Sequence, residues 1–161
     1  IAYFGGSFTA IDRADMIYLL SVAKKFIDDG RVESIRISTR PDCIDEEIVG
    51  ILRSYGVKSV ELGIQSSSER VLEVSGRGHG FECCKKASAL IIGAGMEFVG
   101  QMMTGLPGST KEDEIRTAEA IAEWVFITTI FPAKSTERML RIKTESPESC
   151  RVSAGAVLLC V

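Results

Sequence analysis

The chain has 161 residues, of which 45% are hydrophobic and 25% are charged, and its formal net charge is −3 at pH 7. Ordinary apolar content with a low net charge excludes an intrinsically disordered chain and indicates a globular fold with a substantial core. The slightly acidic balance also excludes an overall basic field that would attract nucleic acid or anionic lipid.

Runs of β-forming apolar residues recur along the chain and predict five strands. These are Ile1–Phe4, Glu33–Ser38, Ser59–Leu62, Glu97–Met102 and Val125–Ile130. Between them, apolar residues recur at helical spacing. The predicted helices are Arg13–Asp28, Asp45–Ser54, Ser68–Val74, Phe81–Ile92 and Lys111–Trp124. Parallel strands need such crossover connections, so the alternation predicts a parallel α/β sheet.

Two architectures fit this order of elements: an open doubly wound sheet and part of a (β/α) barrel. A complete eight-unit barrel takes ~250 residues, so the five units of this chain would form only an arc of one. In both architectures a ligand binds beyond the carboxyl ends of the strands.

Glycines and hydrogen-bonding side chains follow the strands at that predicted edge. They lie in Gly5-Gly6-Ser7, in Ser38–Asp42, in Glu61–Ser66 and in Gln101–Gly108. None of these loops is a P-loop or a G-x-G-x-x-G dinucleotide fingerprint. Four polar loops at one edge of a sheet nevertheless predict a binding site for a small polar ligand.

Two residues in the segment that follows the Ser68–Val74 helix, Arg77 and His79, have both a functional and a structural interpretation. Arg77 either binds a carboxylate through its guanidinium or is a solvated arginine beside a glycine cap. His79 is the single histidine of the chain. It has no visible acidic or nucleophilic partner for a catalytic triad, so we interpret it as structural.

The cysteines indicate reduced thiols in the cytoplasm. They are Cys43, Cys83, Cys84, Cys150 and Cys160. Their odd number and the lack of C-x2-C spacing disfavour a disulfide scaffold or a chelating pair. No apolar stretch approaches the ~20 residues of a membrane helix, and no secretory signal is visible. We therefore expect a cytoplasmic protein without a membrane partner.

Several short motifs occur in a fixed order along the chain. They are Tyr3–Thr9, Ser38–Asp42, Tyr55–Val57 with Val60–Ser66, Gly76–His79, and Gln101–Met103 with Gly105–Gly108. As an ordered set they resemble the radical S-adenosylmethionine superfamily, over about Ile1 to Trp124. The likeness is closest to the branch of the elongator catalytic subunit and its shorter bacterial relatives, and looser to oxygen-independent coproporphyrinogen III oxidase. It implies a partial (β/α) barrel that lacks at least the first strand and the cluster loop.

The resemblance implies a binding site for S-adenosylmethionine. The residues that fall on the family's contact positions are Gly5, Gly6, Ser7, Ser38, Gln65, Arg77 and Gln101. The glycine motif would receive the amino group, and Ser38 would approach the methionine or ribose portion. Gln65 and Arg77 would contact the ribose and the methionine carboxylate. Gln101 stands at a ribose position that is often acidic in the relatives, and its amide can still hydrogen-bond a hydroxyl.

The resemblance also implies a [4Fe–4S] cluster in the intact protein, held by three cysteines spaced C-x3-C-x2-C. No cysteine of this chain has that spacing, and the loop that would carry the motif would precede Ile1. We therefore expect an N-terminally truncated chain, with a degenerate homologue that lost the cluster as the alternative. No metal ligand is assigned.

Residues 1–124 are thus predicted to form a partial radical S-adenosylmethionine barrel, and 125–161 a divergent or aberrant tail that can include one further strand. In that tail, Ile130–Pro132 is interpreted as the turn that follows a strand in the relatives. The intact parent would cleave S-adenosylmethionine to a 5′-deoxyadenosyl radical, with tRNA modification implied by family analogy.

Without the cluster cysteines, this chain alone is expected to be inactive. The alternative is a module that binds S-adenosylmethionine or a nucleotide without turnover. A doubly wound nucleotide-binding domain of another kind is disfavoured, because its fingerprint is absent.

Overall fold

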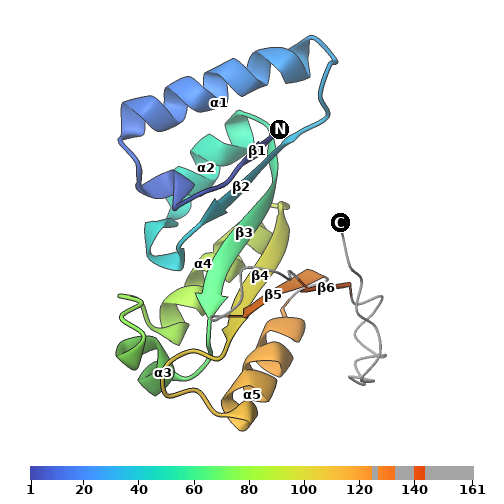
Figure 1. Cartoon of the computed structure of the whole chain (residues 1–161). Helices are drawn as coiled ribbons and strands as arrows, with labels where there is room; N and C mark the ends of the chain where they lie inside the picture. The colour runs from blue at the N-terminus through green and yellow to red at the C-terminus, as the bar shows by residue number, and fades with distance from the viewer. Residues whose placement is uncertain (125–126, 133–139, 144–161) are drawn as a thin grey trace.

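The computed structural model describes residues 1–124, 127–132 and 140–143, and within them the strands form a single twisted sheet (Figure 1). The strands are β1 (Ala2–Tyr3), β2 (Ile35–Thr39), β3 (Val57–Gln65), β4 (Glu97–Thr104), β5 (Ile127–Pro132) and β6 (Leu140–Lys143). Their order in the sheet is the order of the chain, from β1 to β6. The first five strands are parallel, and β6 runs antiparallel to β5.

This strand order decides between the two predicted architectures. A doubly wound sheet reverses its strand order at a switch point, whereas a (β/α) barrel adds each new strand beside the previous one. Here each crossover places the next strand on the same side, so the sheet is an arc of a barrel. The prediction of a parallel α/β partial barrel is confirmed.

The helices connect the strands and lie on one face of the sheet (Figure 1). They are α1 (Arg13–Asp28), α2 (Glu46–Ser54), α3 (Glu69–Val74), α4 (Phe81–Gly93) and α5 (Lys111–Ala122), with short 3-10 turns η1 (Phe8–Ala10) and η2 (Pro41–Cys43). Side-chain caps fix several helix starts. The Asp12 carboxylate accepts from the backbone of Ala14, and the Asp45 carboxylate accepts from that of Ile48, at 2.8 and 2.7 Å.

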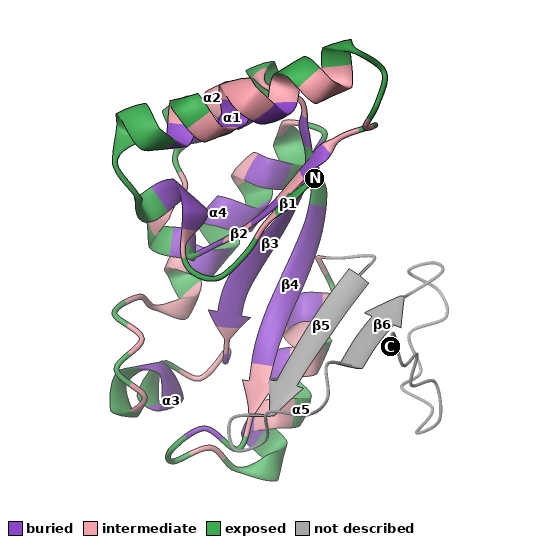
Figure 2. Ribbon diagram, turned by 45° about the horizontal axis from the view of Figure 1, so that its top comes forward, coloured by how far each residue is buried: buried purple, intermediate pink, exposed green. Residues whose placement is uncertain are grey.

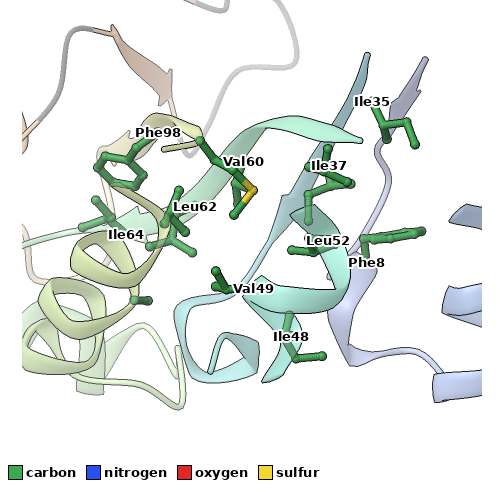
Figure 3. Close-up of a cluster of buried hydrophobic side chains, with 14 of the residues drawn as sticks. Phe8, Ile35, Ile37, Ile48, Val49, Leu52, Val60, Leu62, Ile64 and Phe98 are labelled. Atoms are coloured by element: carbon green, nitrogen blue, oxygen red, sulfur yellow. The ribbon is translucent and has the colours of Figure 1, made fainter. Parts of the chain in front are cut away.

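The hydrophobic core lies between the helices and the sheet. Ile35 and Ile37 from β2 and Val60, Leu62 and Ile64 from β3 alternate along their strands toward it, and all five are fully buried. Figure 3 shows these side chains meeting Ile48, Val49 and Leu52 of α2 and Phe98 of β4. Figure 2 shows β3 and β4 buried along most of their length, while the outward sides of the helices are exposed.

The observed elements extend the predicted strands at their carboxyl ends. The predicted third and fourth strands stop at Leu62 and Met102, but β3 continues to Gln65 and β4 to Thr104. Residues beyond the predicted strand ends, among them Gln65 and Thr104, therefore lie within the sheet. The reason is that polar side chains on the face away from the helices need no loop to avoid the apolar core.

Two expectations for the end of the chain are also changed. Ile130–Pro132, interpreted as a turn, belongs to β5, and the sequence analysis did not predict β6 as a separate antiparallel strand. The boundary between residues 1–124 and a tail over 125–161 stays a prediction. Residues 125–126, 133–139 and 144–161 lie outside the described residues.

Candidate cofactor-binding site

The site is built at the carboxyl edge of the parallel strands, where the β2, β3 and β4 arrowheads point (Figure 1). Side chains alternate along a strand, so the residues between core positions lie on the sheet face opposite the helices. Arg36 and Ser38 alternate with buried Ile35 and Ile37 in this way, and Glu61 lies between Val60 and Leu62. Arg36, Ser38 and Glu61 therefore lie on this opposite face.

A polar row crosses that face from β2 to β4. The Arg36 guanidinium forms an ion pair with the Glu61 carboxylate, and the side-chain amide of Gln101 donates to the same carboxylate. Glu61 and Gln101 are both buried, with exposed fractions of 4% and 9%. Burial of a carboxylate is tolerated only with such partners. The sequence analysis did not assign a role to Arg36 or Glu61.

Gln65 has an unusual backbone and an unsatisfied side chain. Its φ of 70° makes it the one non-glycine residue of the described chain in the left-handed region. Its side chain folds back over Gly63, where a Cβ would lie 2.7 Å from Gln65 Nε2. Gln65 Oε1 is buried, and no described residue donates to it. A buried amide oxygen without a partner is costly, so this acceptor fits a bound donor.

The strand register brings Gln65 and Gln101 together. Gly63, over which the Gln65 amide lies, pairs with Gln101 across β3 and β4, and Gln65 itself pairs with Met102. The register shifts between Gly63 and Gln65, which is the irregularity that accommodates the positive φ. The two glutamine amides therefore occupy neighbouring positions on the sheet face opposite the helices.

Arg77 reaches the same edge from the loop between α3 and α4. Its Nη2 contacts the sulfur of Met103, two residues after Gln101 in β4. Its Nε is buried, and within residues 1–124 it has no hydrogen-bond partner. Burial lowers the pKa of the Arg77 guanidinium below the ordinary arginine value. An anionic ligand would compensate this loss of hydration, so Arg77 fits a carboxylate better than a solvated surface position.

Hydrogen bonds from α5 and α3 hold the surrounding loops. Thr117 Oγ1 accepts from the Ser67 backbone at 2.9 Å, and a Glu114 oxygen accepts from the Gly105 backbone at 2.6 Å. The loop that carries Arg77 is closed where Glu69 accepts from the Phe81 backbone at 2.8 Å. These contacts fix the segments after β3 and β4 as well as the Arg77 loop.

The remaining predicted residues lie at the same edge, further along the sheet. Gly5 has a φ of 103°, a conformation that disfavours a side chain, and a Cβ on either Gly5 or Gly6 would meet no atom within 4 Å. Ser7 precedes η1, and Ser38 pairs with Glu61 across β2 and β3. No hydrogen bond among the described residues joins Gly5, Gly6, Ser7 or Ser38 to Gln65 or Arg77.

The described cysteines are free thiols, and among the described residues no group of three His, Cys, Asp or Glu side chains is arranged to hold a metal ion. Cys84 is fully buried, and burial raises its pKa to about 12. His79 lies 3.7 Å from the Cys84 sulfur through Nδ1, and burial lowers its pKa. Cys150 and Cys160 lie outside the described residues.

Comparison with known proteins identifies the family. Residues 1–121 match the sequence profile of the Radical SAM superfamily. The chain belongs to this superfamily. No helix among the described residues is long and apolar enough to span a bilayer. The family uses S-adenosylmethionine and a [4Fe–4S] cluster, and the cluster was predicted above for the intact protein.

Sequence relatives point to the elongator-like branch. The chain is 25% identical over 114 residues to protein YhcC of Escherichia coli K12, covering 68% of this chain and 37% of that protein. It is 35% identical over 82 residues to the tRNA uridine(34) acetyltransferase of Methanocaldococcus infernus, covering 51% of this chain and 15% of the relative. The chain thus spans well under half the length of these relatives.

Solved structures share the fold. The Elp3 structure of Methanocaldococcus infernus superposes with a TM-score of 0.72 at 23% identity, over 82% of this chain and 36% of that one. Coproporphyrinogen III oxidase (HemN) of Escherichia coli superposes with a TM-score of 0.67 at 20% identity, over 81% of this chain and 31% of that one. Both likenesses named in the sequence analysis are therefore confirmed.

Proposed function

We propose that this radical SAM chain binds S-adenosylmethionine at the carboxyl edge of its sheet through Gly5, Gly6, Ser7, Ser38, Gln65, Arg77 and Gln101. The observation that carries the proposal is the unsatisfied acceptor of Gln65, held over Gly63 beside Gln101. Arg77 adds an unsatisfied donor at the same edge.

The hydrogen-bonding groups of these residues fit the chemistry of this cofactor. A ribose offers hydroxyl donors, which suit the amide oxygen of Gln65, and the methionine carboxylate offers an acceptor, which suits the Arg77 guanidinium. Gly5 leaves room for backbone groups to approach the amino group. When bound in the intact enzyme, the cofactor supplies hydrogen-abstracting radical chemistry, while the residues of this chain bind and orient it.

The described residues do not fit the iron–sulfur cluster. A cluster of this kind is held by cysteine thiolates, and Cys43, Cys83 and Cys84 do not assemble into a set of three ligands. Burial raises the pKa of each of these thiols, which disfavours the thiolate. No reaction step is therefore assigned to this chain alone, and cofactor binding without turnover is the function proposed for it.

Calorimetry with S-adenosylmethionine tests this proposal. The wild-type chain is expected to bind, and Arg77→Ala is expected to weaken binding by about tenfold or more, because hydrogen bonds to charged groups contribute about 1.5–3 kcal/mol. Arg53→Ala is the matched control, since Arg53 is exposed in the last turn of α2, which leads into the amino end of β3 and not to the carboxyl edge of the sheet. Equal affinity of wild type and Arg77→Ala would remove Arg77 from the site.

For an intact parent protein, we propose tRNA uridine modification. The support is the set of relatives named as tRNA uridine(34) acetyltransferases, which match 51–58% of this chain. Nucleosides of tRNA from cells with and without the gene can be compared by mass spectrometry. Loss of one modified uridine is expected, and unchanged tRNA nucleosides would overturn the proposal.

A further inference from the structure

Glu61 lies near the middle of β3 and has both carboxylate oxygens engaged. Oε1 forms the ion pair with Arg36 of β2, and Oε2 accepts from Gln101 of β4. The Glu61 side chain is only 6% exposed, so both contacts are made out of bulk water. Neither contact belongs to the core between the sheet and the helices.

The chemistry of a carboxylate determines how the Gln101 amide is oriented. An ionised carboxylate can only accept hydrogen bonds, and Arg36 supplies its countercharge, so the Gln101 group that faces Glu61 must be the NH2. The amide oxygen of Gln101 is then turned away from Glu61.

We propose that Glu61 is a positioning residue, which fixes the Gln101 amide so that its oxygen, together with Gln65 Oε1, offers two neighbouring acceptors to a vicinal diol. The register carries the second half of this inference, because Gly63 under the Gln65 amide pairs directly with Gln101. Two adjacent acceptors match the two O–H donors of a ribose and distinguish it from a deoxyribose. Gln101 thereby presents an acceptor oxygen to the ligand, as an acidic residue at the same position would.

The identity of the ligand in this inference rests on the proposed function, whereas the orientation of the amide does not. A substitution at Glu61 changes that orientation. In Glu61→Gln, Arg36 takes the single amide oxygen, so the new NH2 faces position 101 and forces the Gln101 amide to turn over. Gln101 then presents NH2 instead of oxygen toward the ligand.

The ligand-free test is NMR of the Gln101 side-chain amide in the whole chain. In wild type, one amide proton is expected to be shifted downfield and protected by its charge-assisted hydrogen bond, and Glu61→Gln is expected to abolish that signature. Glu97→Gln is the control, because Glu97 is an exposed residue at the start of the same β4 strand. An unchanged Gln101 amide in Glu61→Gln would overturn the proposal.

The ligand test compares adenosine with its 2′- and 3′-deoxyfluoro analogues, which keep a weak acceptor but lose a donor. Glu61→Gln is expected to weaken adenosine binding about three- to tenfold, which is the effect of one hydrogen bond. It is also expected to reduce the ratio between the affinities for adenosine and for its deoxyfluoro analogues. Glu97→Gln should behave as wild type. Equal preference in wild type and Glu61→Gln would contradict the role assigned to Glu61.

The exchange variant E61Q/Q101E tests whether weaker binding by Glu61→Gln comes from the amide orientation or from a change in folding. The new carboxylate at position 101 accepts both from the new amide at position 61 and from the ribose, so adenosine binding is expected to recover. Failure of a folded exchange variant to recover would also count against the proposal. If wild type shows the amide signature but binds neither adenosine nor S-adenosylmethionine, the proposed function fails while the orientation of Gln101 stands.

Discussion

Gly63 is the residue on which the position of the Gln65 amide depends. A Cβ at this position would lie 2.7 Å from Gln65 Nε2, which is the far end of a flexible side chain. Gly63→Ala is therefore expected to displace the amide with little loss of stability, and to weaken binding of S-adenosylmethionine about tenfold through one lost buried contact. Calorimetric titration measures the affinity, and urea unfolding measures the stability.

Gly93→Ala provides the control for this substitution. Gly93 is the last residue of α4, and a Cβ there would meet nothing within 4 Å. The variant is expected to bind as wild type does. Wild-type affinity in Gly63→Ala as well would show that the Gln65 amide has no part in binding.

At the residue scale, the motif order pointed to side chains at the carboxyl edge of the sheet but not to how they interact with one another. Gln65 and Arg77 were identified from short motifs, and both carry unsatisfied polar atoms in the structure. Glu61 was read as part of a polar loop. The signal for its role is a charged residue in the middle of a buried strand, whereas its partners depend on the register of three strands, which one sequence does not specify.

Gly100 determines how closely α5 packs against β4. A Cβ at this position would lie 2.5 Å from Ile121 Cγ2 and 3.4 Å from Ile64 Cδ1, and both isoleucines are fully buried. Because the core cannot yield easily, Gly100→Ala is expected to lower the free energy of unfolding by about 1–3 kcal/mol. Urea unfolding followed by circular dichroism measures this loss.

Gly50→Ala is the contrasting substitution in the same experiment. Gly50 lies on the exposed side of α2, and a Cβ there would meet no atom within 4 Å. Removing glycine from an unobstructed helix is expected to raise the free energy of unfolding by about 0.5–1 kcal/mol. A Gly100→Ala variant as stable as wild type would contradict the packing described for α5.

Asp113 links the start of α5 to its surroundings and gives stability a pH dependence. Its carboxylate accepts from the Thr110 backbone at 3.0 Å, and Arg116 and Arg70 donate to it at 2.7 and 3.0 Å. The hydrogen bond from the Thr110 backbone, followed by the contact with Arg116, lowers the pKa of Asp113 below the ordinary aspartate value.

A carboxyl group whose pKa is lowered by folding stabilises the protein above its unfolded pKa of about 4, and this contribution is lost as the pH falls through the lower folded value. The difference in Tm between wild type and Asp113→Asn is therefore expected to shrink as the pH is lowered from 6 toward about 2. Thermal melts across this range measure it. Glu119→Gln, at an exposed position of α5, is the control and should show no such trend. A Tm difference between wild type and Asp113→Asn that stays constant with pH would contradict the stabilising role given to the Asp113 carboxylate.

At the scale of elements, the helices were easier to predict than the ends of the strands. The predicted Arg13–Asp28 helix coincides with α1, and Asp45 and Ser68 are the caps of helices that begin one residue later. Helix starts are encoded locally by capping residues. The ends of β3 and β4 depend instead on pairing with neighbouring strands, so polar residues such as Gln65 resembled a loop until the register placed them within the sheet.

At the scale of the whole molecule, the sequential strand order brings the segments that carry the candidate residues to one edge of the sheet. Because each crossover advances by one strand, the loops after β1, β2, β3 and β4 follow one another along the same rim. The alternation of strands and helices predicted a parallel sheet with its ligand edge at the carboxyl ends of the strands. It did not predict whether that sheet is an arc of a barrel or a doubly wound sheet. That choice depends on the direction of each crossover, which has no local sequence signal in this chain.

The positions of the described cysteines in the molecule predict whether the chain can bind an iron–sulfur cluster. Cys84 is buried among core residues, and its pKa of about 12 keeps it protonated at neutral pH. Cluster ligands must be thiolates, and among the described residues no three ligands converge. Anaerobic reconstitution of the whole chain with iron and sulfide is therefore expected to yield no stoichiometric cluster, as measured by bound iron, acid-labile sulfide and visible absorbance.

The triple variant C43A/C83A/C84A makes the result specific to the described cysteines. Wild type and this variant are expected to retain the same small background of iron after desalting. A stoichiometric cluster in wild type that disappears in the variant would show that these thiols rearrange into a ligand set. It would contradict the proposal that this chain alone binds the organic cofactor without supporting turnover.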